Sequence, residues 1–166
     1  TAFSRHAEIH DTTIGWRFIN KAMHAAYGTD SMPQTGQNVA DDYGISREAQ
    51  DLMALSSQAK AAAAQANGRL AQEITPVTIP QKKGDALVVS QDEHPRATTV
   101  EALAKLKPLF PNGSVTAGNA SGVNDGAAAL LLASEAGVAR HGLQPLARIT
   151  GFATTGVLPR VMGIGP

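Results

Sequence analysis

The chain has 166 residues, of which 43% are hydrophobic and 17% charged, which suits one globular unit with a core. Its fourteen basic and fourteen acidic residues give a net charge of zero, which disfavours nucleic-acid binding because neutralising phosphates takes a basic surplus. We see no membrane-length apolar run and no targeting signal, and the lack of cysteine excludes disulfides, thiolate metal sites and a cysteine nucleophile within this sequence.

The first half of the sequence predicts two helices. Residues 1–30 hold the only Trp, but an internal glycine interrupts their pattern, so no element is predicted there. A proline typical of a first helical turn and a later glycine predict a helix over 34–43. Ser46 suits the N-cap of a second helix over 47–66, which is rich in alanine and ends at an Asn-Gly pair.

The middle of the sequence predicts a hairpin and a short helix. Residues 74–80 alternate threonine with apolar side chains, as a strand does, and 86–90 pair back across a Lys-Gly-Asp turn. Thr98 and Glu101 have the spacing of a capping box, which predicts a helix that runs to Leu106.

The last third of the sequence is rich in Gly, Ala and Leu. The apolar run 127–133 predicts a strand buried on both faces, with a buried helix as the alternative. Ser134 caps a predicted helix that ends at His141, and 146–154 predict a second strand. No helix is predicted at the end, over 161–166. Strand, helix, strand indicates a covered α/β sheet, and one such unit needs further chain or partners to cover both faces.

Two loops could carry binding chemistry. The motif AGNASG at 117–122, followed by Asn-Asp-Gly, combines glycines with small side chains, so its backbone N–H groups can come close to a ligand. Its composition also fits a pair of ordinary turns, and it matches neither a Walker loop nor the dinucleotide fingerprint. Arg96, in the loop DEHPR, either clamps a phosphate or adenine or belongs to a solvated loop.

Other charged residues give weaker signals. The five histidines lack metal-ligand spacing, so no metal site is predicted, and no GxSxG elbow indicates a serine hydrolase. Lys82 and Lys83 lie at the expected hairpin rim, where they could add positive potential near a phosphorylated ligand. Arg17 either pairs with a substrate carboxylate or stacks on the neighbouring Trp16.

The segment VTAGNASGVNDGAAALLLASE resembles the motif that follows the loop domain of thiolases, the acetyl-CoA acyltransferase family. The resemblance continues through PLARITGFATTGVLPRVMGIGP and covers essentially the whole chain. Upstream, DTTIGWRFIN, YGTDSMPQTGQNVADDYGISREAQD and DEHPRATTVEALAKLKP resemble the branch that acts on β-ketoadipyl-CoA (3-oxoadipyl-CoA) in aromatic-compound breakdown.

The resemblance implies an α/β fold in which two βαβαβαββ halves stack in five layers and a loop domain is inserted into the first half. It divides the chain into a loop domain (1–113), the end of the N-terminal half (114–145) and the start of the C-terminal half (146–166). The residues alone place one boundary, between an accessory region over 1–113 and a sheet-forming region over 114–166. The chain would thus be an internal fragment of a thiolase.

The resemblance also implies an activity. Thiolases cleave a 3-oxoacyl-CoA with CoA to give acetyl-CoA and a shortened acyl-CoA, using cysteine and histidine and no metal or redox cofactor. Coenzyme A is then a substrate rather than a cofactor. Because the family's cysteine and histidine motifs lie outside this sequence, no catalytic residue is assigned, and the fragment alone is expected to be inactive.

The family pattern assigns a binding role to three residues of the AGNASG motif. Ser121 resembles the serine that hydrogen-bonds the pantetheine arm of CoA. Ala117 and Gly118 match the small residues that line the arm, where larger side chains would block it. The prediction is that this stretch leaves a narrow slot for the flexible tail of the thioester.

Three more positions match the family's binding residues. Arg96 resembles the loop-domain arginine near the adenine and phosphates, Phe110 an aromatic wall of the pantetheine tunnel, and Met32 a methionine near the acyl end. Ser31 stands where some short-chain members have histidine, which leaves room for a longer or polar acyl group. Arg17 is the candidate partner of its terminal carboxylate.

Several alternatives stay open at this point. The enzyme could instead act on fatty-acid 3-ketoacyl-CoA or acetoacetyl-CoA, or the chain could be a non-catalytic module that binds CoA or lipid. We expect a cytoplasmic protein that binds CoA and acyl-CoA thioesters, not nucleic acid or membranes, and that forms a homodimer or homotetramer when complete.

Overall fold

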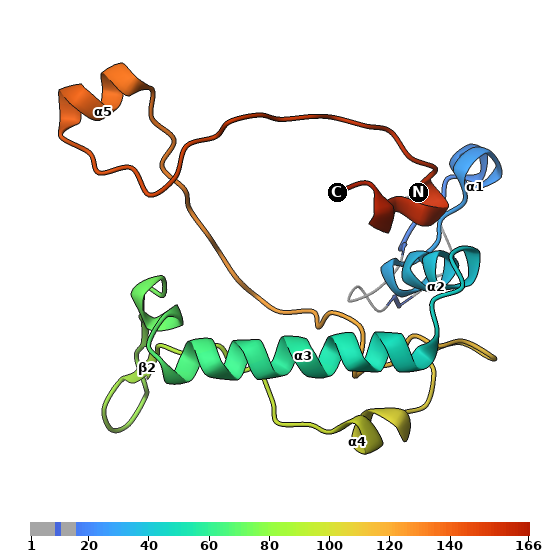
Figure 1. The fold of residues 1–166 in the computed structure, drawn as a ribbon. Coiled ribbons are helices and arrows are strands. Elements are labelled where there is room, and N and C mark those ends of the chain that lie inside the picture. The colour runs from blue at the N-terminus through green and yellow to red at the C-terminus, as the bar shows by residue number, and fades with distance from the viewer. Residues whose placement is uncertain (1–8, 11–15) are drawn as a thin grey trace, which may run out of the picture.

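The computed structural model describes residues 9–10 and 16–166 of the chain (Figure 1). A long helix, α3, forms the spine, and two extended limbs carry α5 far from it (Figure 1). The elements are α1 (Lys21–Tyr27), α2 (Met32–Asp42), α3 (Arg47–Ala66), η1 (Leu70–Gln72), β1 (Val77–Ile79), β2 (Leu87–Val89), α4 (Val100–Ala104), α5 (Glu135–His141) and η2 (Pro159–Ile164).

Side-chain caps set the start of the first three helices. The Ser46 hydroxyl accepts from the Ala49 amide at 3.1 Å, so α3 confirms the prediction over 47–66. Helix α2 starts two residues before the predicted 34, because Ser31 is its cap. Helix α1 lies in a region where no element was predicted; the Asn20 side chain caps it by accepting from the Met23 amide.

The middle elements follow the predictions with shifted bounds. Strands β1 and β2 pair antiparallel, with Val77 opposite Val89, and confirm the hairpin. The prediction that Thr98 caps the next helix is wrong: Thr99 accepts from the Ala102 amide at 3.2 Å, and α4 ends at Ala104 rather than at Leu106. The cap moves by one residue because the hydroxyl of Thr99, not that of Thr98, reaches the free amides of the first turn.

The expected sheet of the last third does not form. Residues 121–133 and 143–158 make two extended limbs that enclose an open ring with α5 at its far end (Figure 1). Within the described residues neither limb has a strand to pair with, and a strand is stable only when its backbone groups find such a partner. Leu131 is accordingly 81% exposed and Phe152 96% exposed. The strands predicted over 127–133 and 146–154 are therefore wrong for this structure, as is the buried helix considered for the first.

Two further features of the last third concern helices. Helix α5 confirms the prediction that Ser134 caps a helix ending at His141, and Gly142 closes it in a left-handed conformation. The expectation of no terminal helix is wrong, because η2 forms over Pro159–Ile164 and packs on α2. This packing buries Val161, and the burial of its apolar side chain stabilises η2 against α2.

The core of the described residues is small and half polar. Its buried apolar side chains are Ala40, Leu103, Val115 and Val161, and its buried polar ones are Thr35, Gln37, Asp51 and Thr116. Most of it lies where α2, α3 and α4 meet the segment after α4, and Val161 lies where η2 packs on α2. Over the part of the chain that the structure describes, no helix is long and apolar enough to cross a membrane.

Candidate functional site

The AGNASG motif begins in a loop, residues 114–120, that side chains of α2 and α3 hold in place. The Gln37 carbonyl oxygen accepts from the amides of Ser114 at 2.8 Å and Val115 at 3.1 Å. The amide of the Gln37 side chain and that of Gln50 both donate to the Ser114 hydroxyl, at 3.3 and 2.9 Å. The start of the loop is thus fixed to two helices at once.

Asn119 fixes the other end of the loop. Its Oδ1 accepts from the Thr116 amide at 2.7 Å, and its Nδ2 donates to Asp51 Oδ1 and to the Ser114 carbonyl, both at 3.0 Å. Asp51 is only 2% exposed and also accepts from Arg47 Nε at 2.8 Å. These bonds satisfy a buried carboxylate and fold the loop back on itself.

The small residues of the motif face two ways. A Cβ on Gly118 would lie 2.5 Å from Leu106 Cδ1 and 2.6 Å from Leu103 Cδ2, so this glycine packs directly on the α4 region. Ala117 and Ser121 are exposed. The motif therefore packs on the protein at Gly118, while Ala117 and Ser121 are accessible, and the predicted slot stays a prediction.

The loop that carries Arg96 lies against the end of the motif. A Cβ on Gly122 would lie 2.1 Å from His94 Cε1, so the imidazole rests on this glycine. The Arg96 amide donates to Gln58 Oε1 on α3 at 2.9 Å, and its Nε donates to the His94 carbonyl at 3.3 Å. The loop that carries Arg96 thus contacts the motif at Gly122, the residue after Ser121.

A groove of about 320 Å³ runs between α3 and the segment that carries Arg96. One wall is formed by apolar and amide residues of α3, and the other by the segment Pro95–Thr98. The lining residues are Leu55, Gln58, Ala59, Ala62, Gln65, Pro95, Arg96, Ala97 and Thr98. A second cavity of about 230 Å³ lies at the base of the hairpin, lined by Gln65, Leu70, Ala71, Ile74, Pro76, Ser90 and Gln91.

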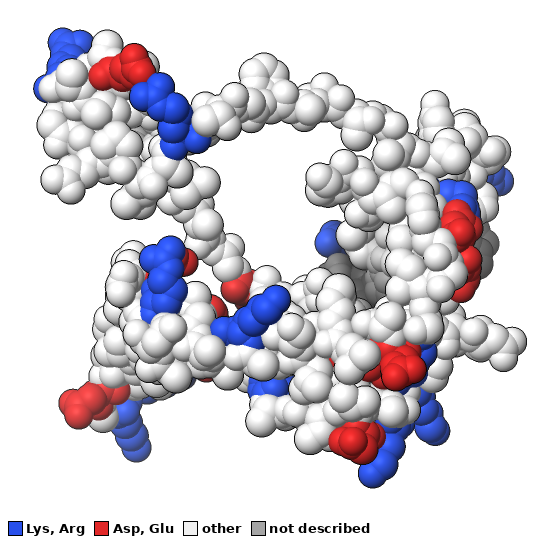
Figure 2. All heavy atoms as spheres, in the orientation of Figure 1, with Lys and Arg blue, Asp and Glu red and all other residues white. Residues whose placement is uncertain are grey.

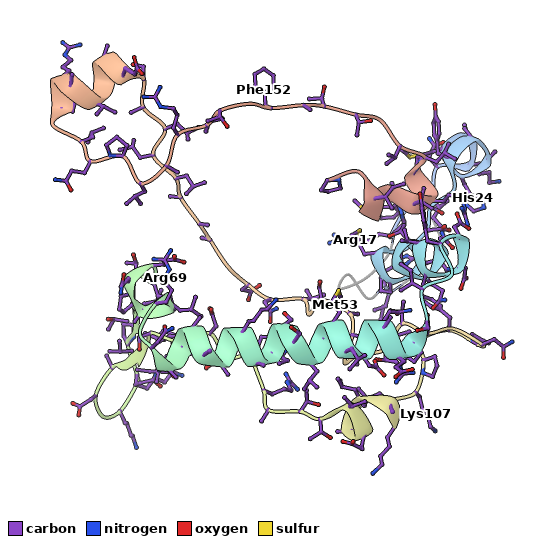
Figure 3. The ribbon with its side chains drawn as sticks, in the orientation of Figure 1. Arg17, His24, Met53, Arg69, Lys107 and Phe152 are labelled. Carbon is purple, nitrogen blue, oxygen red and sulfur yellow. The ribbon has the colours of Figure 1, made fainter. Side chains whose placement is uncertain are left out.

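The other predicted site residues lie outside this groove. Met32 is exposed at the first turn of α2, and Phe110 is half-buried in the turn that leads to the motif loop. Arg17 is exposed and extends into the open ring, toward which Met53 of α3 also points (Figure 3). Among the described residues Arg17 makes no ion pair.

Charge is distributed without a dominant sign. Figure 2 shows basic and acidic side chains interspersed over this face of the molecule. Lys82 and Lys83 lie in the hairpin turn and are exposed. In the described ranges, 9–10 and 16–166, no three His, Asp or Glu side chains gather as a metal site.

An ion pair joins the end of α2 to η2. Arg160 donates to both carboxylate oxygens of Asp42, and its carbonyl accepts from Asn38 Nδ2 at 2.9 Å. The hydrogen bonds from Arg160 lower the pKa of the Asp42 carboxyl below its ordinary value. At the start of α4, the backbone N–H of Glu101 and the Thr99 hydroxyl lower the pKa of the Glu101 carboxyl in the same way.

Sequence reasoning missed the residues that hold the loop. Gln37, Asp51 and Asn119 carry the buried bonds, yet none was singled out for a role. One signal was present, since Arg47 and Asp51 are four residues apart and therefore share a helix face. His94 was noted only as part of a charged loop.

The family is shown by comparison with known proteins. The family described as "Thiolase, N-terminal domain" matches residues 2–136. The chain therefore belongs to the thiolase family, which confirms the resemblance read from the AGNASG motif.

Curated relatives match the whole of this chain but only part of their own length. The chain is 62% identical to a beta-ketoadipyl-CoA thiolase of Pseudomonas putida, over 100% of this chain and 42% of that protein. It is 58% identical to the 3-oxoadipyl-CoA/3-oxo-5,6-dehydrosuberyl-CoA thiolase of Escherichia coli, with the same coverage. The chain thus spans about two fifths of the length of the curated relatives it matches.

Solved structures confirm the fold class. A crystal structure of the Bacillus anthracis acetyl-CoA acetyltransferase superposes with a TM-score of 0.82 at 44% identity, over 99% of this chain and 40% of that one. Human mitochondrial 3-ketoacyl-CoA thiolase matches 81% of this chain with a TM-score of 0.74. The predicted α/β, thiolase-like fold fragment is therefore confirmed.

Proposed function

We propose that this chain is the CoA-binding part of a thiolase that transfers an acyl group between 3-oxoadipyl-CoA and CoA. The products are acetyl-CoA and an acyl-CoA shortened by two carbons. The observation that carries the proposal is the geometry of the AGNASG loop. Buried hydrogen bonds hold the loop on α2 and α3, while Ala117 and Ser121 are exposed. The loop that carries Arg96 contacts the motif at Gly122. The family and the names of the relatives support the activity.

The chemistry of the proposed reaction requires a thiolate. A cysteine attacks the 3-oxo carbon of the substrate, the bond between C2 and C3 breaks, and the acetyl-CoA carbanion takes up a proton. The thiol of free CoA then receives the acyl group. Because this sequence contains no cysteine, the nucleophile belongs to the rest of the enzyme, and the chain alone is inactive.

The described residues supply positioning in this proposal. Arg96, on the wall of the groove beside α3, binds the phosphate and adenine end of CoA, since a guanidinium both pairs with phosphate and stacks on a ring. The pantetheine arm passes Ala117 and hydrogen-bonds to Ser121. Lys82 and Lys83 add positive potential. Holding the thioester in one geometry contributes a large factor to the rate.

The acyl end of the substrate is assigned to a different part of the chain. Met32 lies near the acyl group and Phe110 along the tunnel, as the family pattern implies. The exposed Arg17 pairs with the terminal carboxylate of 3-oxoadipyl-CoA, a group that acetoacetyl-CoA lacks. Ser31 at the neighbouring position leaves space for this longer acyl group.

We propose that the exposed limbs are core segments of the complete enzyme. Leu130, Leu132 and Ile149 are exposed here and have the composition of buried strands. In a homodimer or homotetramer of the complete enzyme, neighbouring strands would pair with them. This assembly would act in the cytoplasm on CoA thioesters.

A hybrid enzyme tests the proposed function. This chain replaces the matching segment of the Pseudomonas putida beta-ketoadipyl-CoA thiolase, to which it is 62% identical. We expect CoA-dependent cleavage of 3-oxoadipyl-CoA, measured as acetyl-CoA formation, at a higher kcat/KM than for acetoacetyl-CoA. An inactive hybrid contradicts the thiolase proposal, and a preference for acetoacetyl-CoA or a long-chain 3-ketoacyl-CoA contradicts the substrate.

A substitution at Ser121 then tests the binding role. In the hybrid, Ser121→Leu fills the exposed side of the motif and is expected to raise the KM for CoA about tenfold or more. Ser57→Leu is the matched control, because Ser57 is exposed on α3 and lies two residues, about 200° around the helix, from the groove-lining Leu55. Unchanged KM in Ser121→Leu removes this serine from the site.

A further inference from the structure

The amide of Asn119 lies at the centre of the AGNASG motif but makes its bonds to the protein. Its oxygen accepts from the Thr116 amide, and its nitrogen donates to Asp51 and to the Ser114 carbonyl. One acceptor and two donors of the amide are therefore in use, which leaves one lone pair. The Asn119 side chain thus holds the loop to the protein by hydrogen bonds, while Ala117 in the same loop is exposed.

Asp51 is the buried carboxylate to which Asn119 donates. Its side chain is 3% exposed, and both oxygens are used, one by Asn119 and the other by Arg47. Arg47 Nη2 in turn donates to the carbonyls of Leu103 at 2.6 Å and Leu106 at 3.0 Å. One chain of charge-assisted hydrogen bonds therefore joins α3, the end of α4 and the motif loop.

The direction of the hydrogen bond is fixed by the partners. Asp51 can only accept when it is ionised, and Arg47 can only donate, so the nitrogen of Asn119 must face Asp51. Its oxygen is then directed at the Thr116 amide, which closes the turn that displays Ala117. The oxygen and the nitrogen of the Asn119 amide cannot exchange places without breaking these three hydrogen bonds.

We propose that Asn119 and Asp51 are positioning residues that set the position of the CoA-binding loop and thereby the affinity for CoA. The proposal rests on the proposed function of that loop. Neither side chain touches the reacting atoms, so their loss acts on the binding of the arm. A shifted loop raises the KM for CoA and leaves kcat at saturating CoA close to the parent value.

The hybrid enzyme described above is the test. Asn119→Asp replaces the donor by an acceptor, so two carboxylates face each other across the 3.0 Å contact. The double variant Asp51→Asn with Asn119→Asp exchanges the two groups and restores a donor opposite an acceptor at this contact, while the donor to the Ser114 carbonyl stays lost. Arg160→Ala is the control, because it removes a charged contact between α2 and η2 that does not involve the loop.

We expect Asn119→Asp to raise the KM for CoA about tenfold or more with kcat changed less than about threefold. The double variant is expected to bring KM part of the way back toward the parent value, because only the bond to the Ser114 carbonyl is then missing, and Arg160→Ala is expected to lower Tm without changing KM. If Asn119→Asp is insoluble, the double variant decides, and its failure to recover CoA affinity overturns the proposal. So does an unchanged KM in Asn119→Asp, whereas an inactive parent hybrid overturns the proposed function itself.

Discussion

The contact between Gly118 and α4 predicts that a single methyl group at this position destabilises the protein. The added Cβ would lie 2.5 and 2.6 Å from two leucine methyls, where carbon atoms ordinarily stay about 3.5 to 4.0 Å apart. Leu103 is 3% exposed and has no room to withdraw, while the more exposed Leu106 can rotate. Overpacking of this kind costs about 1 to 3 kcal/mol, and the fixed Leu103 places Gly118→Ala in the upper half of that range.

Urea denaturation of the hybrid enzyme, followed by the circular dichroism of its helices, measures this effect. Gly36→Ala is the matched control, because Gly36 lies in α2, outside the limbs, and a Cβ there meets nothing within 4 Å. We expect Gly118→Ala to lower the unfolding midpoint and Gly36→Ala to leave it unchanged or raise it slightly. Adding Leu106→Ala to Gly118→Ala relieves one of the two overlaps, so the pair should cost less than the sum of the single changes. Equal midpoints for Gly118→Ala and the parent would refute the packing argument.

Two more predictions concern charged residues. Because Arg160 lowers the folded-state pKa of Asp42 below the ordinary 3.8, this carboxylate stabilises the protein above pH 3.8, and the stabilisation is lost as pH falls through the folded pKa. The Tm difference between the parent hybrid and Asp42→Asn should therefore shrink as pH falls from about 6 to about 3, and a constant difference would contradict the linkage. Arg96→Ala is expected to raise the KM for CoA about tenfold without changing the KM for pantetheine, which lacks the nucleotide phosphates; equal effects on both acceptors would exclude a phosphate contact.

Local signals in the sequence located the elements that local forces stabilise. Helix α3 needs only a serine cap, twenty residues of good helix formers and an Asn-Gly stop, all of which are visible in the sequence. The short helix α1 was missed because its seven residues bury no side chain and are too few for a periodic pattern to stand out. At the start of α4 the sequence has two adjacent threonines, Thr98 and Thr99. The capping-box spacing to Glu101 favoured Thr98, but Thr99 is the cap.

The limbs show what a local pattern leaves open. Their apolar runs have the composition of buried strands, but a strand needs a neighbour, and the described residues provide none for 127–133 or 146–154. The leucine run is therefore extended and exposed in this chain. The TM-score of 0.82 against the Bacillus anthracis acetyl-CoA acetyltransferase shows that the fold class was predicted correctly, although neither of these two strands forms among the described residues.

The hydrogen bonds that hold the motif loop could not be predicted from the sequence, because the residues that they join are far apart in the chain. Asp51 and Asn119 are separated by 68 positions, and Gln37 contacts Ser114 across 77. Asp, Asn and Gln are common on helix surfaces and in turns, so their types alone give no reason to pair them. Only the meeting of α2, α3 and the loop makes them a buried network.

The glycines of the motif have a different role from the one that their composition indicates. Glycine-rich loops are expected to bring the backbone close to a ligand, yet Gly118 makes room for two leucines and Gly122 for the ring of His94. Both contacts are with the protein itself, and both would be lost to any larger residue. The exposed Ala117 and Ser121 are then left to face a ligand. Close packing of the glycines on one side of the loop thus leaves Ala117 and Ser121 exposed on the other, so in the proposed function the same motif serves both folding and CoA binding.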